Sequence, residues 1–195
     1  RFDLSKGVTT EFWVNFNSSW TNTSGDIPGN QVLFDLHNGA LSSSVGYGRL
    51  LIFATGSKNE AGADPIRVHL ASGSNVWDVG FGGSTFTTSS LKDTWNHIAL
   101  SFVSSSTQLE AKFYVNGNLH ETETNTTVAA LGEITGSLKA RIGAGVFGPS
   151  GSTSPSIPDG QQTNGHSPFH GSMDEFRYWK TARTHEEIAK NYFRH

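Results

Sequence analysis

The feature that most constrains the fold is a series of short runs in which every second residue is apolar. The runs at 10–16 (TEFWVNF) and 95–103 (WNHIALSFV) each place three large apolar side chains on one face. Successive side chains of a β-strand point to opposite faces, so this period of two predicts strands with one buried side. Further strands are predicted at QVLFDL, RLLIFATG, IRVHLAS, VWDVGFG, AKFYV and ARIGAG.

Turn-forming residues separate these runs. Asn116-Gly117 predicts a tight hairpin turn, since the commonest two-residue hairpin loops need positive φ at both residues. A long segment, 149–170, shows almost no apolar periodicity, and a loop of that length in a compact domain is usually functional or disordered. We therefore predict one all-β domain spanning 1–195. Without an initiator Met or signal peptide, we expect it to be a segment of a larger protein.

The C-terminal stretch changes from strand to helix. Met173 to Trp179 alternates as a strand, and Asp174 shares the parity of its apolar residues. A carboxylate on a buried face needs hydrogen-bond donors, a cation or a metal ion as partners, so Asp174 is predicted to be a buried anchor or a metal ligand. Thr184 and Glu187 then form a T-x-x-E capping box, which predicts a short helix. We expect this helix to cover an open end of the molecule.

Charge and cysteine content exclude several classes of function. The formal net charge is -3 and the chain has no basic run, so neither nucleic acid nor an anionic membrane is an expected partner. Without cysteine there is no disulfide framework and no thiolate nucleophile. Gly, Ser, Thr and Asn are abundant while charged residues make up 16%, which favours neutral polar partners. No apolar run is long enough to insert into a membrane.

Four stretches resemble the laminin-G-like, concanavalin-A-like jelly-roll superfamily, in the form shared by pentraxins and many secreted or surface proteins. They are WNHIALSFVSSSTQLEAKFYVNGNL, ARIGAG, FHGSMDEFRYWKTARTHEEI and, near the start, TEFWVNF. The resemblance implies a two-sheet antiparallel jelly-roll β-sandwich with one short C-terminal helix. It also implies an extracellular or cell-surface setting, and glycans, peptides or proteins bound at loops, often through calcium.

The resemblance separates scaffold aromatics from candidate ligand contacts. Trp13, Trp95 and Trp179 lie at positions of the family pattern, whereas Trp20 and Trp77 do not. Aromatic rings next to polar groups suit sugars, whose C–H faces stack and whose hydroxyls need hydrogen bonds. The alternative is that Trp77 is simply packed. The predicted ligand-binding residues are His37, Asn38, Tyr47, Trp77, Phe147, Gln161 and His166.

Calcium prefers oxygen ligands, which loops supply readily. The run of adjacent carboxylates that pentraxins place after the R-I-G strand is missing here, so a double-calcium site is not expected. A single calcium held by Asp159 and Asn164, or a structural one at Asp174, is the prediction. The alternative is that these residues cap their own turns.

Enzymatic function lacks most of its required residues. Glycoside hydrolases need two carboxylates flanking the scissile bond, and Glu121 with Glu123 is the only i, i+2 acidic pair. Neither HExxH nor G-x-S-x-G occurs, and the G-x-G-x-x-G match at 143–148 precedes no helix. The prediction is therefore a non-catalytic module that binds a glycan or glycoconjugate in an adhesin or other surface protein. The alternatives are a protein-binding or peptide-binding domain, a spacer domain and, last, a glycan-cleaving enzyme.

Overall fold

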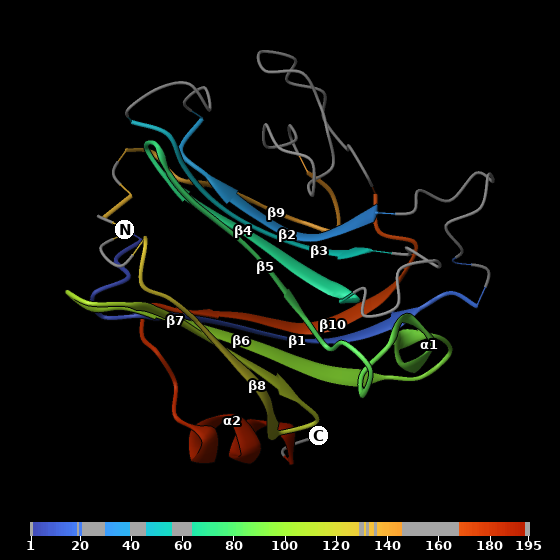
Figure 1. Ribbon diagram of the computed structural model, residues 1–195. Helices are drawn as coiled ribbons and strands as arrows, with labels where there is room; N and C mark the ends of the chain where they lie inside the picture. Colours follow the sequence, from blue (N-terminus) through green and yellow to red (C-terminus); the bar gives the residue numbers. More distant parts are fainter. Residues whose placement is uncertain are drawn as a thin grey trace. The chain divides into compact units, whose positions relative to one another are not determined.

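The structure is a computed structural model that describes residues 2–18, 20, 30–39, 46–55, 64–128, 131, 133–134, 136–145 and 168–193. These residues divide into two compact units. The first lies within 1–17, 90–133 and 171–195, and the second within 18–89 and 134–170. Each described unit contains one five-stranded antiparallel sheet (Figure 1).

The sheet of the first unit has the strand order β10-β1-β6-β7-β8. Its strands are β1 (Val8–Phe16), β6 (Asn96–Ser104), β7 (Leu109–Val115), β8 (Asn118–Asn125) and β10 (Gly171–Trp179). Phe12 pairs with Ile98 and Leu100 pairs with Phe113, and all four side chains are fully buried. Each such side chain stabilises the fold by about 1.5–3 kcal/mol. The predicted alternation of β1 and β6 is thus the pattern of a buried face.

The turn between β7 and β8 is the one that the sequence predicts. Asn116 has a φ of 50° and Gly117 a φ of 79°, the positive values that a tight hairpin turn needs. Beyond it, the polar stretch HETETN forms most of β8, which the alternation did not predict. β8 lies at the edge of the described sheet, next to β7. An edge strand is partly exposed and often carries polar side chains, so its sequence need not alternate.

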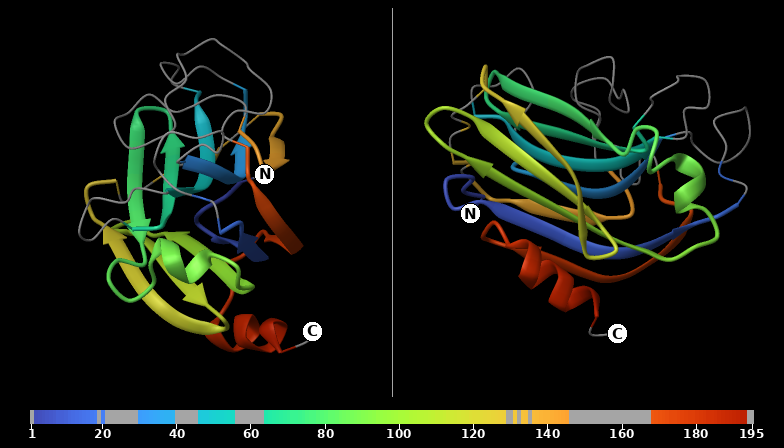
Figure 2. Two further views of the ribbon diagram at one scale, coloured as in Figure 1. Left: turned by 90° about the vertical axis from the view of Figure 1, so that its right-hand side faces the viewer. Right: turned by 60° about the horizontal axis from the view of Figure 1, so that its bottom comes forward.

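Helix α2 (His185–Tyr192) packs on one face of this sheet (Figure 2). Ile188 is fully buried and clusters with Ala99 and Tyr114, while Tyr192 stacks on Trp13 with ring centroids 5.4 Å apart. The predicted capping box is confirmed at Thr184, the residue before the helix. The expectation that the helix covers an open end is wrong: it lies on the face of the sheet that carries Trp13.

The sheet of the second unit has the strand order β5-β4-β3-β2-β9. Its strands are β2 (Asn30–His37), β3 (Gly48–Thr55), β4 (Ile66–Ser72), β5 (Asn75–Phe81) and β9 (Lys139–Ile142). One face is apolar, since Ile52 pairs with Val68 and Val68 pairs with Val79, and all three are buried. The opposite face carries most of the charged side chains of these strands.

The predicted all-β class, with two antiparallel sheets and one short C-terminal helix, is confirmed. A four-residue helix, α1 (Thr88–Leu91), was not predicted, because four residues are too few to show a helical period. Within the described residues, no helix has the length and apolar character that crossing a membrane requires.

Candidate functional site

The strand register gathers ionisable side chains on one face of the second unit's sheet, which we call the polar face. Side chains on paired residues share a face, and so do residues two apart along a strand. One row across the sheet runs Arg49, His37 and Lys139, and the next runs Asp78, His69, Leu51, Asp35 and Arg141. The ionisable residues of the polar face are Asp35, His37, Arg49, Arg67, His69, Asp78, Lys139 and Arg141.

A buried ion pair lies near the centre of the polar face. Arg49 donates from Nε to Asp35 Oδ1 at 2.8 Å and from Nη2 to Asp35 Oδ2 at 2.9 Å. Their side chains are 1% and 0% exposed. Such a two-point pair fixes both side chains, and its two charges cancel each other within the sheet.

His37 lies beside this pair and is held in one tautomer. Its Nδ1 accepts a hydrogen bond from the main-chain N–H of Gly39 at 3.1 Å, so the ring proton of the neutral form is on Nε2. Burial lowers the pKa of His37, and the charges of Arg49, Lys139 and Arg141 lower it further against the opposing effect of Asp35. Three cations therefore act on this one imidazole.

His69 offers a buried acceptor. Its Nδ1 lies 2.7 Å from Asp78 Oδ1, and a carboxylate accepts but does not donate, so Nδ1 carries the hydrogen. Nε2 is buried and has no hydrogen-bond partner among the described residues. His69 is only 2% exposed, whereas the Asp78 side chain is 34% exposed. A buried, unpaired nitrogen costs about 1–3 kcal/mol, which a buried water would recover.

The exposed charges of the polar face lie at its edges. Lys139 and Arg141 are both exposed on β9, the edge strand next to β2 (Figure 1). On the opposite edge, β5 presents Asp78 and Val76, the latter 40% exposed. The exposed side chains of the polar face thus lie at its two edges, with a buried ion pair between them.

Two of the predicted ligand-binding residues have structural partners. The Asn38 side chain donates to the carbonyl of Gly46 and accepts from the N–H of Gly48 at 3.2 Å, so it braces the link between β2 and β3. Tyr47 is 3% exposed, and its carbonyl accepts from Gly73 N–H at 2.6 Å. His37 is the one predicted residue that the register brings into the polar face.

Trp77 lies on the other face of the same sheet. It pairs with Leu70 and is 7% exposed, so its ring belongs to the packed side of β5. Trp20 is fully buried. We leave both out of the site. The remaining predicted ligand-binding residues, Phe147, Gln161 and His166, lie outside the described residues, as do the predicted metal ligands Asp159 and Asn164.

The prediction that Asp174 is buried is wrong, because a β-bulge reverses its side. The pairing of β1 with β10 shifts between Glu11 and Trp13, where β10 carries one residue more, and Glu175 there has a φ of 51°. Asp174 pairs with Trp13, is exposed, and accepts from Glu175 N–H at 2.7 Å. Asp174 is therefore not the buried anchor that the parity predicts, and its role as a calcium ligand stays a prediction.

No group of three or more His, Asp or Glu residues suited to a metal occurs in the part of the chain that the structure describes. The calcium predicted at Asp159 and Asn164 lies outside the described residues, and the one predicted at Asp174 stays a prediction.

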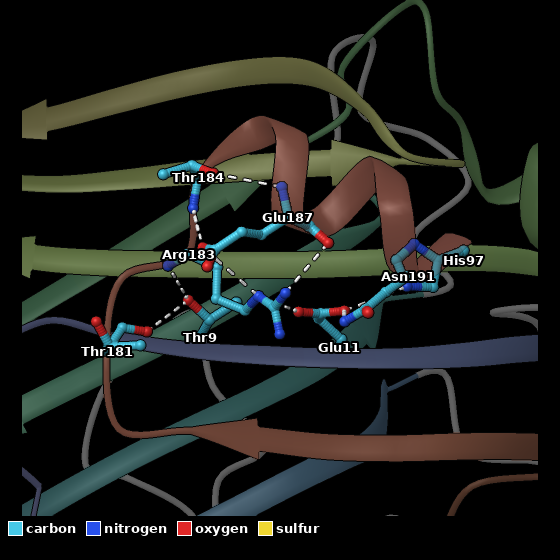
Figure 3. A network of polar contacts seen from close by, with 8 residues as sticks. All are labelled: Thr9, Glu11, His97, Thr181, Arg183, Thr184, Glu187 and Asn191. Atoms are coloured by element: carbon cyan, nitrogen blue, oxygen red, sulfur yellow. Dashed lines mark hydrogen bonds and ion pairs between the residues drawn. The ribbon is translucent and has the colours of Figure 1, made fainter. Parts of the chain in front are cut away.

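A second cluster of ionisable residues lies in the first unit, beneath α2 (Figure 3). Glu11 is fully buried; it accepts from Asn191 Nδ2 at 3.1 Å, and its carboxylate lies 3.4 Å from Arg183 Nε. Burial alone would raise the pKa of Glu11, but His97, whose Nε2 lies 3.8 Å from Glu11 Oε2, the hydrogen bond from Asn191 and the charge of Arg183 outweigh it and lower the pKa. All these partners belong to the helix, its leading segment or the sheet beneath, so the cluster anchors α2.

The acidic pair Glu121 and Glu123 lies on edge strand β8, opposite Phe113 and Ala111. Both glutamates are partly buried. The structure places them in the first unit, and the polar face in the second.

Comparison with known proteins identifies the fold. A family model for laminin-G-type domains, described as the concanavalin A-like lectin/glucanases superfamily, matches residues 1–189. No curated protein matches the chain significantly.

Solved structures give likenesses in fold at low sequence identity. The CBM40 module of a Ruminococcus gnavus IT-sialidase, bound to α2,3 sialyllactose, is 15% identical with a TM-score of 0.56, covering 97% of this chain and 83% of that one. The binding domain of Paraclostridial Mosquitocidal Protein 1 is 12% identical with a TM-score of 0.55, covering 98% and 38%. A SAP-like pentraxin from Limulus polyphemus is 14% identical with a TM-score of 0.50, covering 95% and 69%.

Proposed function

Because the chain belongs to the concanavalin A-like lectin/glucanase superfamily, we propose that it is a non-catalytic glycan-binding module whose site is the polar face. A glycan needs donors and acceptors held in fixed positions. The polar face offers the carboxylate of Asp78, held by the buried His69, and the exposed cations of β9.

The observation that supports the proposal is the partly exposed carboxylate of Asp78, which the buried His69 ring holds in place. His69 Nδ1 lies 2.7 Å from Asp78 Oδ1, so the carboxylate has one orientation. A carboxylate accepts hydrogen bonds but does not donate them, and this favours a ligand rich in hydroxyl groups. The matching fold of the R. gnavus module, solved with α2,3 sialyllactose, supports a sugar as that ligand.

The spacing of the strand carboxylates argues against glycan cleavage by Asp35 and Asp78. These are the two carboxylates that the described strands place on the polar face, besides that of Asp64, which lies over Gly80; they belong to β2 and β5, three strand spacings apart. Their main chains are therefore about 14 Å apart. Glycoside hydrolases hold their two carboxylates roughly 5–9.5 Å apart, so this pair is too widely separated.

A glycan array tests the proposal, run with calcium and with a chelator. Binding of at least one glycan is expected. Asp78→Leu, which removes the acceptor from the edge of the polar face, is expected to weaken that binding about 5-fold to 10-fold, the value of one hydrogen bond. The control is His185→Phe, an exposed histidine in α2. If the protein binds none of the neutral or acidic glycans on the array, the proposal is wrong.

The alternatives within the superfamily have their own signatures. A protein-binding or peptide-binding domain would bind a partner chain without competition from any sugar, and a spacer would bind neither. A glycan-cleaving enzyme would release sugar from a substrate and lose this activity with Glu123→Gln. An extracellular or cell-surface location is part of the proposal, because an adhesin meets its glycans there.

A further inference from the structure

We infer that the sugar bound at the polar face is anionic, and that Lys139 and Arg141 on β9 bind its negative group. The inference rests on the proposed function and names the chemical class of the ligand. It also departs from the composition of the chain, which by itself favours neutral partners.

The first argument is the local charge. On the part of the polar face formed by β2, β3 and β9, the described residues include three cations, Arg49, Lys139 and Arg141, and one carboxylate, Asp35. Asp35 already receives two hydrogen bonds from Arg49. Counted over the described residues, the β9 side of the face therefore carries more cations than carboxylates, on a chain whose formal net charge is -3. A local positive region on an acidic chain favours an anionic ligand.

The second argument is the environment of His37. Lys139 pairs with His37 across the sheet, and Arg141 pairs with Asp35. The positive charges of Arg49, Lys139 and Arg141 all oppose a further charge on the imidazole. These charges hold the His37 ring neutral, so the ring adds no positive charge. A negative ligand group at β9 would offset the mutual repulsion of Lys139 and Arg141, which a neutral sugar would leave in place.

The third argument is the geometry of β9. Lys139 and Arg141 are two residues apart in one strand, so their side chains leave the same face with main-chain positions about 6.6 Å apart. Both are exposed at the sheet edge. Arginine presents a planar fork that binds a carboxylate at two points, and lysine adds a point charge beside it.

Edge strands also carry charges simply to prevent pairing with another sheet. That role needs exposed charges on β9 but not charges on one face. Lys139 and Arg141 share one face, with Lys139 next to His37 and Arg141 next to Asp35, and this favours a binding site. Under the edge-protection alternative, substituting Lys139 or Arg141 would not change the affinity for any sugar.

Calorimetric titration of the full chain tests the inference, with 3′-sialyllactose, a glucuronic-acid-terminated disaccharide, a sulfated lactose and lactose as probes. We expect at least one anionic sugar to bind ten times more tightly than lactose or better. The three anionic probes distinguish a sialic acid, a uronic acid and a sulfate as the source of the charge. The affinity of the bound anionic sugar is expected to fall as the salt concentration rises.

Lys139→Gln and Arg141→Gln are each expected to lower the affinity for that sugar at least 5-fold, and the affinity for lactose less than 2-fold. Lys180→Gln is the matched control, an exposed lysine in the first unit. Circular dichroism establishes that each variant is folded.

Two results would overturn the inference in different ways. If lactose binds as tightly as the anionic sugars, or if the β9 substitutions leave anionic-sugar binding unchanged, the inference fails while glycan binding stands. If no sugar binds at all, the proposed function fails and the inference fails with it.

Discussion

Asp35 and Arg49 are joined by two parallel hydrogen bonds, of 2.8 and 2.9 Å, between strands that are otherwise mostly apolar. Both side chains are buried, so neither charge can turn to water if the other is removed. The pair therefore links the stability of the second unit to the charge of the polar face.

Arg49→Met is expected to destabilise the protein by about 3–5 kcal/mol, because it leaves the Asp35 carboxylate buried and unpaired. The double variant Asp35→Leu with Arg49→Met removes both charges and is expected to recover most of that loss. Urea unfolding measures both. A loss below about 1 kcal/mol for Arg49→Met would contradict a buried, two-point pair.

Glu11→Gln tests the anchoring of α2 in the first unit. The folded pKa of Glu11 lies below its ordinary value of 4.5, so its stabilising contribution is present above pH 4.5 and is lost as the pH falls through the folded pKa. The variant is expected to cost about 1.5–3 kcal/mol at pH 7 and to flatten the acid side of the stability curve. Urea midpoints from pH 3 to 7 measure this.

The control for Glu11 is Glu186→Gln, an exposed acid in the first turn of the same helix. Identical pH profiles for Glu11→Gln and the unsubstituted protein would contradict the proposed anchor.

Thr184→Ala removes the side chain that accepts from Glu187 N–H at the start of α2. A lost N-cap costs about 1 kcal/mol. Since Glu187 Oε2 also accepts from Thr184 N–H at 3.0 Å, the double variant with Glu187→Ala should cost less than the sum of the single changes. Thermal unfolding of the three variants measures the coupling, and strict additivity would speak against a reciprocal box.

His37 reports the charge of the polar face. Its folded pKa lies below the ordinary 6.5, so the unfolded chain binds its proton first and this residue lowers stability as the pH falls below 6.5. Lys139→Gln removes one opposing charge and should raise the pKa of His37, as should a bound anionic sugar. The His37 ring resonance, followed by NMR against pH, measures both shifts. An unchanged titration in Lys139→Gln, matching that in Lys180→Gln, would show that Lys139 does not act on His37.

The sequence predicted most of the fold because the buried strands show their period of two directly. The pairs Phe12–Ile98 and Leu100–Phe113 follow from alternation alone. Edge strand β8 was not predicted, because a strand with one neighbour and a partly exposed face needs no apolar pattern.

Asp174 shows a limit of parity arguments. One residue in a bulge reverses the side of every residue before it, and nothing in MDEFRYW marks Glu175 as the residue with positive φ. The parity of Phe176 therefore did not extend back to Asp174.

The polar face was not predicted from the sequence, although the sequences of its strands contain a signal for it. QVLFDL and RLLIFATG are nearly continuous apolar strands, and each carries one charged residue, Asp35 and Arg49. Charges inside such strands must be paired, and hairpin pairing of these two runs would have brought them together. His69 and Asp78 carry the same signal in the next two strands, but their pairing depends on a register that the sequence does not state.

The location of glycan binding tests the account most directly. Amide chemical shifts of the isotope-labelled protein, recorded during titration with the glycan that binds best on the array, should change in β2, β3, β4 and β9, with the largest changes near His37, His69 and Arg141. Changes confined to β8, β10 and α2 of the first unit, or none at saturating glycan, would contradict a binding site on the polar face.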